Sequence, residues 1–257
     1  MTEKTTGHTA SELLAVMSSR LMRDGTVVFA GVGIPLLAAT LAQRVNCPGL
    51  TILFEGGVVG PMIEPGKLPP STNEQRCTRR ANMVLSSTDV LLLLQRGYVD
   101  IGFMGGAQID RFGNLNSSFI GDPNHPKTRL PGTGGGNDIS SLTHMIVAMK
   151  HEKRRFVERV DFITSPGFIR GGSSRADSGL LAGGMYRVVT DLGIFGFEEV
   201  SKAMQVLALH PGVSLEQVRD NTSFDVLDHP GRSVTEPPSE LELSVLRELD
   251  PAALYIS

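Results

Sequence analysis

Residues 50–60 read Leu50-Thr51-Ile52-Leu53-Phe54-Glu55-Gly56-Gly57-Val58-Val59-Gly60. A short run of branched and aromatic residues is typical of a buried parallel strand, and ligands of open α/β sheets bind just beyond the carboxyl ends of such strands. We therefore expect Glu55 to face a crevice. Gly56 and Gly57 carry no Cβ atom, which permits a positive φ and the close approach of a substrate to the backbone. Taken alone, an acid at this position more often caps a helix or closes a turn.

The segments before this stretch predict a strand-helix-strand order. Residues 26–30 are typical of a strand, 31–33 of a tight turn, and 35–45 of a helix with proline in its first turn. Because the Glu55 strand follows, the two strands should pair in parallel with a right-handed crossover. An amphipathic helix capped by Ser11 is expected over 11–22. The pattern predicts an α/β fold with an open, mainly parallel sheet flanked by helices.

The rest of the chain continues this pattern. Residues 61–80 are rich in Pro, Ser, Thr and Asn and should form a long irregular segment, followed by a buried helix over 86–96. Further elements are predicted as strands over 99–104, 143–149, 159–164, 186–191 and 203–209, and as helices over 214–222 and 240–248. A length of 257 residues suits one large α/β domain, and we expect a single domain over 1–257.

Composition narrows the classes of partner. Net charge is -3 and 40% of the residues are hydrophobic, which gives no electrostatic reason to expect nucleic acid or an anionic membrane. Residues 1–10 are polar and lack a signal-peptide core, and no apolar run approaches the roughly 20 residues that cross a bilayer. We expect a cytoplasmic protein. Cys47 and Cys77 have no CxxC spacing and the six histidines are scattered, so no metal site is expected.

Three glycine-rich turns are candidates for ligand binding. Residues 31–35 resemble the start of a dinucleotide fingerprint, but Leu36 stands in place of its third glycine. Gly33 could still begin an anion-binding site at the helix N-terminus, or it could simply form a turn. Gly105, Gly106 and Gln108 follow a predicted strand, where backbone N–H groups can form an oxyanion hole or a plain bend. The tract 132–138, which includes Gly135, suits either covering a cofactor-like chain or mere linkage.

Two charged segments are further candidates. Lys153, Arg154 and Arg155 lie in the run 151–156 and could meet phosphates, although such a run is more often a solvated face. His125, Lys127 and Arg129 lie in a polar tract and could contact a carboxylate. No GxSxG elbow is present, which leaves a carboxylate as the best candidate nucleophile.

Taken together, these segments resemble the B (β) subunit of family I CoA-transferases, in the glutaconate CoA-transferase branch. The resemblance runs through nearly the whole chain and is carried by residues 31–35, 55–57, 105–110, 121–122 with 125–129, and 151–156 leading to 164–167. It implies the family I fold, with coenzyme A as a substrate and no permanently bound cofactor. It also implies a homologous A (α) subunit, a heterotetramer, and an active site at the junction of the two subunits.

For Glu55 the resemblance implies covalent catalysis through an acyl-glutamyl anhydride and then a glutamyl-CoA thioester. Gly105 matches the position whose N–H binds the oxyanion, with Gly106 beside it; Gly56, Gly57 and Gln108 join this oxyanion and CoA set, and Gly33 and Gly135 are assigned to substrate or CoA loops. The expected reaction moves CoA between a short-chain dicarboxylic or branched acyl-CoA and a carboxylic acid.

Three alternatives to this transferase stay open. Relatives with the same fold act as decarboxylases of glutaconyl-type CoA esters or as ring-opening CoA-ester hydrolases, and there Glu55 would act as a base. A third interpretation is a nucleotide-binding regulatory module built on the turn at 31–33, which would bind nucleotide tightly as an isolated chain. Gly56 stands where these enzymes commonly have Asn or Ser, and 58–80 matches them poorly, which leaves the acyl substrate open.

Overall fold

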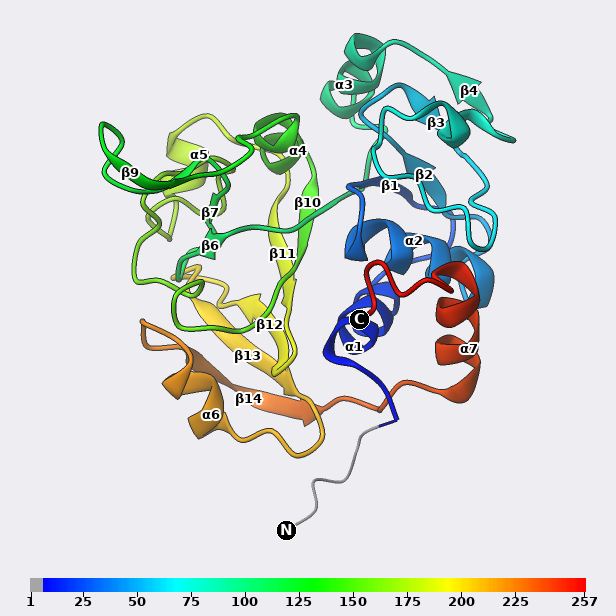
Figure 1. Ribbon diagram of the computed structural model, residues 1–257. Helices are drawn as coiled ribbons and strands as arrows, with labels where there is room; N and C mark the ends of the chain where they lie inside the picture. Colours follow the sequence, from blue (N-terminus) through cyan, green and yellow to red (C-terminus); the bar gives the residue numbers. More distant parts are fainter. Residues whose placement is uncertain (1–6) are drawn as a thin grey trace. The chain divides into compact units, whose positions relative to one another are not determined.

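Strands β1 (Val27–Ala30) and β2 (Thr51–Leu53) pair in parallel, with Val28 opposite Ile52, as the strand-helix-strand order predicts. The computed structural model describes residues 7–257, so residues 1–6 of the polar N-terminal stretch lie outside the described part of the chain. It divides into two compact units, here called unit 1 (up to Leu92, and again from Pro237 to Ser257) and unit 2 (Leu93–Glu236) (Figure 1). Both units combine strands with helices, so the α/β class is confirmed. The prediction of a single domain stays a prediction.

Unit 1 carries the Glu55 segment. Besides β1 and β2 it contains α1 (Ala10–Ser19), α2 (Ile34–Val45), β3 (Val58–Val59), the short 3-10 helix η1 (Gln75–Thr78), β4 (Met83–Val84) and α7 (Glu240–Leu249); α3 (Ser87–Gln95) spans the boundary with unit 2. Strand β3 pairs antiparallel with β2 and with β4. The side chains of Ile52, Leu53 and Phe54 are almost fully buried, as a strand inside an α/β fold requires.

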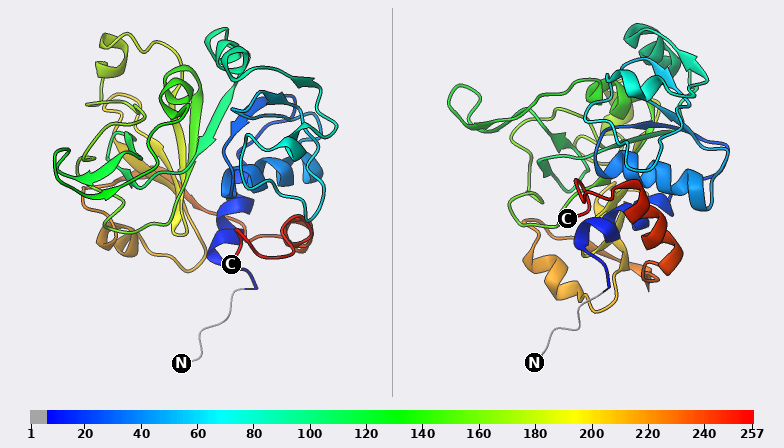
Figure 2. Two further views of the ribbon diagram at one scale, coloured as in Figure 1. Left: turned by 45° about the horizontal axis from the view of Figure 1, so that its top comes forward. Right: turned by 45° about the vertical axis from the view of Figure 1, so that its right-hand side comes forward.

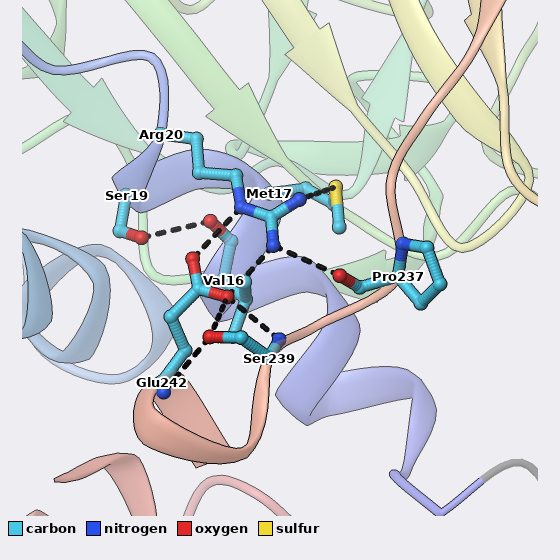
Figure 3. A network of polar contacts seen from close by, with 7 residues as sticks. All are labelled: Val16, Met17, Ser19, Arg20, Pro237, Ser239 and Glu242. Atoms are coloured by element: carbon cyan, nitrogen blue, oxygen red, sulfur yellow. Dashed lines mark hydrogen bonds and ion pairs between the residues drawn. The ribbon is translucent and has the colours of Figure 1, made fainter.

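Polar contacts join the first and last helices of unit 1. The Arg20 guanidinium donates to both carboxylate oxygens of Glu242 at 2.8 and 2.7 Å (Figure 3). Arg247 Nε contacts Glu12 Oε1 at 2.6 Å. Thr9, and not the predicted Ser11, caps α1: its Oγ1 accepts from the Glu12 N–H while its own N–H donates to the Glu12 carboxylate. This reciprocal cap needs a carboxylate three residues later, which Thr9 has and Ser11 lacks.

Unit 2 holds the Gly105 segment. Its elements are β5 (Ile101–Met104), β6 (Gln108–Ile109), β7 (Leu115–Asn116), β8 (Phe119–Gly121), β9 (Pro126–Arg129), α4 (Gly136–Leu142), β10 (His144–Ala148), α5 (Ser174–Asp177), β11 (Gly184–Val189), β12 (Gly193–Phe197), β13 (Met204–Leu209), α6 (Leu215–Asp220) and β14 (Leu227–Val234). Strand β10 pairs in parallel with both β5 and β11. Strands β11, β12 and β13 then alternate in direction, and β14 runs parallel to β13.

Two predicted elements differ from the structure. Residues 159–164 form no strand, because their backbone groups bond elsewhere: Asp161 N–H donates to the Gln108 side chain and Thr164 N–H to the Leu115 carbonyl. Helix α3 lies where it was predicted, but of its residues only Val90 and Leu94 are buried. The segment 61–80 is irregular except for η1, as expected. Within residues 7–257, no helix is both long and apolar enough to span a membrane.

Candidate active site

Glu55 lies in a tight turn directly after β2. The Phe54 N–H donates to the Val58 carbonyl at 2.8 Å, and the Gly57 N–H returns to the Phe54 carbonyl at 3.0 Å, which closes the turn into β3. The Glu55 side chain is half-buried, while the three residues before it are buried. Among the described residues, its carboxylate forms no hydrogen bond and no ion pair. The fold therefore holds the backbone of Glu55 in place and leaves the carboxylate free to react.

The two glycines after Glu55 are required by the packing of the chain itself. A Cβ atom on Gly56 would lie 2.6 Å from both Asn73 Oδ1 and the Thr72 carbonyl oxygen. Gly57 has a φ of +102°, and a Cβ there would lie 1.9 Å from the Leu85 carbonyl oxygen. The expected close approach is thus made by residues 72–73 and 85 of the same chain. No local pattern indicates these contacts, because the partners come from segments further along the chain. Whether Gly56 and Gly57 also contact CoA stays a prediction.

The loop after β5 has open backbone groups. Gly105 is exposed, and a Cβ atom on it would meet only the Ala148 carbonyl oxygen at an ordinary 3.6 Å. Gly106 is tighter, with the Leu115 side chain at 3.1 Å from its missing Cβ. Neither the Gly105 nor the Gly106 N–H donates a hydrogen bond to any group within residues 7–257. Two adjacent unpaired amides beside open space can bind a negatively charged oxygen.

Gln108 supports the loop after β5 through hydrogen bonds of its buried side chain. Its side chain is buried; Oε1 accepts from Asn116 Nδ2 at 2.7 Å and from the Asp161 N–H at 3.1 Å, and Nε2 donates to Asp161 Oδ2 at 3.1 Å. The Ala107 N–H also donates to the Asn116 carbonyl. The Gln108 amide is therefore committed to the protein interior. A direct contact of Gln108 with ligand stays a prediction, while its geometry fits a supporting role.

The charged run 151–156 is largely structural. His151 is buried and its ring stacks on Phe156, with centroids 3.8 Å apart. Its Nε2 lies 2.9 Å from Thr222 Oγ1 and its Nδ1 lies 3.2 Å from Thr190 Oγ1, so both ring nitrogens contact threonine hydroxyls inside the protein. Burial lowers the pKa of His151 to about 3. The imidazole is therefore neutral at physiological pH and is not a phosphate ligand.

The arginines of the same run are paired with an acid. Arg154 and Arg155 both contact Glu152, with Nε to Oε2 distances of 2.6 and 3.2 Å. Arg155 also reaches the loop after β5: its carbonyl accepts from the Ile109 N–H at 2.7 Å and its Nη1 lies 3.5 Å from the Gly106 carbonyl. Two of the three cations are therefore paired with Glu152, Lys153 is exposed, and Arg155 holds one side of the Gly105 loop.

The remaining candidates are placed by their own elements. Gly33 is the N-cap of α2 with a φ of +83°, and its turn leaves the same edge of the parallel β1–β2 pair as Glu55 does. Gly135 caps α4, and the missing Cβ of the adjacent Gly136 points to Met104 at the end of β5. His125, Lys127 and Arg129 lie on the β8–β9 hairpin and are exposed; this hairpin extends as an arm in the right-hand view of Figure 2. Within residues 7–257, no three His, Cys, Asp or Glu side chains are grouped as metal ligands.

Comparisons with known proteins show the family of the chain. Residues 11–221 match the Coenzyme A transferase family. The chain is 38% identical to the B subunit of 3-oxoadipate CoA-transferase from Pseudomonas knackmussii, covering 95% of this chain and 94% of that one. It is also 38% identical to the B subunit of glutaconate CoA-transferase from Acidaminococcus fermentans, covering 98% and 96%.

A solved structure is similar to the chain over nearly its whole length, and a further sequence relative is similar over part of it. The crystal structure of the Acidaminococcus fermentans enzyme superposes with a TM-score of 0.91 at 36% identity and covers 98% of both chains. A cholesterol ring-cleaving hydrolase IpdB subunit of Rhodococcus jostii is 38% identical over a shorter stretch, 59% of this chain and 60% of that one. The chain therefore belongs to the coenzyme A transferase family, as an enzyme subunit of the B type.

Proposed function

We propose that the chain is the catalytic B subunit of a two-subunit enzyme that moves CoA between a short-chain acyl-CoA and a carboxylic acid, with Glu55 as the nucleophile. The observation that carries this proposal is the free carboxylate of Glu55 in a fixed turn at the end of β2. The similar subunits are named as the B subunits of a glutaconate CoA-transferase and a 3-oxoadipate CoA-transferase. Because both acids are dicarboxylic, we infer a dicarboxylic or branched acyl group here.

The proposed chemistry proceeds in balanced steps. The Glu55 carboxylate attacks the thioester carbonyl and expels CoA thiolate, which leaves an acyl-glutamyl anhydride. The thiolate then attacks the glutamyl carbonyl and releases the first acid as its carboxylate, which leaves a glutamyl-CoA thioester. A second carboxylate takes over CoA by the same two steps in reverse, and Glu55 is regenerated. No ATP is needed, because each step exchanges one activated acyl bond for another.

We propose that the loop after β5 supplies the oxyanion donors for this chemistry, as the resemblance to the transferase family implies. Negative charge develops on the thioester oxygen during each attack, and unpaired backbone amides stabilise such charge without having to rearrange. The Gly105 and Gly106 N–H groups are of this kind. We assign them to the oxyanion, and we assign Gln108 and the run 151–156 to holding the loop that carries them.

The A subunit completes the proposed enzyme. The similar chains are named as B subunits, which implies a partner of the A type, and we propose a heterotetramer of the two. The isolated B chain should therefore be inactive, and measurable turnover by it alone would contradict a site shared between subunits.

Intact mass spectrometry of the complex tests the proposal. The complex is exposed to a panel of acyl-CoA esters without acceptor acid. We expect an adduct of the mass of CoA on the B chain that disappears in Glu55→Gln. If the ester is consumed with no adduct on Glu55, the enzyme is a hydrolase or decarboxylase, as the similarity to the ring-cleaving hydrolase subunit would then explain.

A further inference from the structure

One arginine of unit 2 is buried without an acidic partner. Arg175 lies in α5 and is only 5% exposed. Burial lowers the pKa of its guanidinium, and no carboxylate within residues 7–257 raises it. A buried cation is costly unless polar contacts offset its loss of water. The Nη1 and Nη2 atoms of Arg175 contact five acceptors at 2.7–3.1 Å, all of them backbone carbonyl oxygens: those of Ser140, Ser141, Pro166, Gly167 and Ala182.

These five carbonyls belong to three separate segments of the chain. Residues 140–141 form the last turn of α4, whose final carbonyls have no partner inside the helix. Residues 166–167 follow the buried Thr164 and Ser165, and Ala182 precedes β11. A planar guanidinium can bind acceptors from several directions at once, whereas a lysine carries only three donors on one nitrogen. Arg175 therefore cross-links α4, the segment 166–167 and the approach to β11.

Helix α4, the first of these segments, packs closely on β5. A Cβ atom on Gly102 would lie 2.2 Å from Ile139 Cγ2, so the helix can lie this near the strand only because position 102 is a glycine. At the start of α4, the missing Cβ of Gly136 lies 3.4 Å from Met104 Cε. Met104 ends β5 and directly precedes Gly105. A shift of α4 would therefore move the strand end that carries the Gly105 loop.

The segment 166–167 leads to the same loop by a second route. The residue before it, Ser165, accepts a hydrogen bond from the Leu115 N–H at 3.0 Å through its carbonyl. The Leu115 side chain in turn lies 3.1 Å from the missing Cβ of Gly106. Both segments that Arg175 holds thus contact the surroundings of the two unpaired amides, one at Met104 and the other at Gly106. The backbone between these two contacts is short and has little freedom to compensate for a shift of either.

We infer that Arg175 is a positioning residue of the transfer reaction: it holds α4 and residues 166–167 so that the Gly105 and Gly106 N–H groups stay where the oxyanion needs them. The inference rests on the proposed function, because it takes these amides as the oxyanion donors. Arg175 acts through the backbone it binds and touches neither amide. Donors that are fixed in advance lose their value when displaced, and a displacement of about 1 Å can slow a reaction on the order of 100-fold.

The rate of the covalent step tests the inference. The complex with the A subunit is mixed with acyl-CoA without acceptor acid, quenched at set times, and analysed by intact mass spectrometry for the CoA adduct on Glu55. In Arg175→Met we expect the rate of adduct formation and kcat to fall by about 10- to 100-fold. KM for acyl-CoA should change less than about threefold, because the oxyanion forms only during the reaction. Urea unfolding identifies the temperatures at which each variant is folded, and the rates are measured there.

Arg20→Met is the matched control. Arg20 also binds a carbonyl, that of Pro237 at 2.9 Å, and both carboxylate oxygens of Glu242, but these partners lie in unit 1 and do not carry the loop after β5. Its loss should lower the free energy of unfolding and leave kcat within about twofold of the natural value. Arg175→Lys keeps the charge and three donors, so its kcat should lie between those of the natural chain and Arg175→Met.

Several outcomes would overturn the inference while the transferase assignment stands. These are a natural adduct rate in folded Arg175→Met, an effect confined to KM, or an equal loss of kcat in Arg20→Met. If Arg175→Met does not fold, Arg175→Lys takes its place in the comparison, and failure of both variants to fold would assign Arg175 to folding alone. If the natural complex forms no adduct on Glu55, the proposed function itself fails, and the inference that rests on it fails too.

Discussion

The turn after β2 and the loop after β5 both follow a strand and both contain two adjacent glycines, yet the glycines serve different physical purposes. At Gly56 and Gly57 the space of the missing side chains is filled by residues 72–73 and 85 of the same chain. At Gly105 that space is open, and the N–H groups are unpaired. The turn is built to hold a side chain still, whereas the loop is built to leave backbone exposed.

This difference gives opposite expectations for the two pairs of glycines. Adding a methyl group to the turn should disturb folding, and adding one to the loop should disturb turnover. Three measurements test the contrast, beginning with the largest expected change in the free energy of unfolding.

Gly57→Ala should have the largest effect. The new Cβ would lie 1.9 Å from the Leu85 carbonyl oxygen at a φ of +102°, so backbone must move. We expect the free energy of unfolding to fall by about 2–4 kcal/mol, measured with urea. Gly25→Ala is the matched control, because Gly25 has a φ of +75° with nothing within 4 Å and so isolates the cost of the backbone conformation. Equal losses in both variants would show that crowding by Leu85 is unimportant.

Lowering the pH should reduce the free energy of unfolding through His151, which lies in the run 151–156 that holds the Gly105 loop. Its pKa of about 3 in the folded protein lies below the ordinary value of 6.5, so the unfolded chain takes up the proton first. Stability from this group is therefore complete above pH 6.5 and is lost as the pH falls from there toward 3. We expect a loss of roughly 2 kcal/mol between pH 7 and pH 5. His151→Gln removes the titrating group, and its unfolding free energy should fall less over the same interval. Parallel pH dependences in the two proteins would contradict this account.

Gly105→Ala should have the smallest effect on stability. The added Cβ meets only one atom, at 3.6 Å, so the free energy of unfolding should change by less than about 1 kcal/mol. Turnover should nevertheless fall by about 10- to 100-fold, because the methyl group would crowd the oxyanion site proposed there. Steady-state kinetics of the complex with its A subunit provide the measurement. Normal turnover in a normally stable variant would remove Gly105 from the oxyanion assignment.

Much of the fold could be predicted from local patterns. The alternation of strand and helix around Pro35 and the apolar run 51–54 were sufficient to predict the parallel β1–β2 pair. The strand predicted over 159–164 was wrong. The side chain of Asp161 accepts a hydrogen bond from Gln108, which lies 53 residues away in the sequence, and periodicity does not reveal such a partner. The cap of α1 was misplaced although its signal was present: Thr9 and Glu12 have the spacing of a reciprocal cap.

The sequence indicates the candidate nucleophile but not the contacts that hold its turn. Glu55 is a candidate because a carboxylate ends an apolar run before two glycines, a pattern visible within 11 residues. The reason for those glycines depends on Asn73 and Leu85, which only the tertiary structure brings to the turn. The basic run 151–156 shows the same limit: the sequence shows its charges, while the pairing of both arginines with Glu152 depends on how the backbone turns.

Unit 1 is assembled from two segments that are far apart in the chain, so it can complete its folding only after both segments have been synthesised. The ribosome completes residues 7–92, with the Glu55 turn among them, well before it makes α7. Until then Arg20 and Glu12 lack the ion-pair partners that Glu242 and Arg247 provide. Unit 1, with the Glu55 turn, therefore stays incompletely packed while all of unit 2 emerges. Its packing is complete only after α7 has been synthesised, so the folding of unit 1 depends on the synthesis of unit 2 before it.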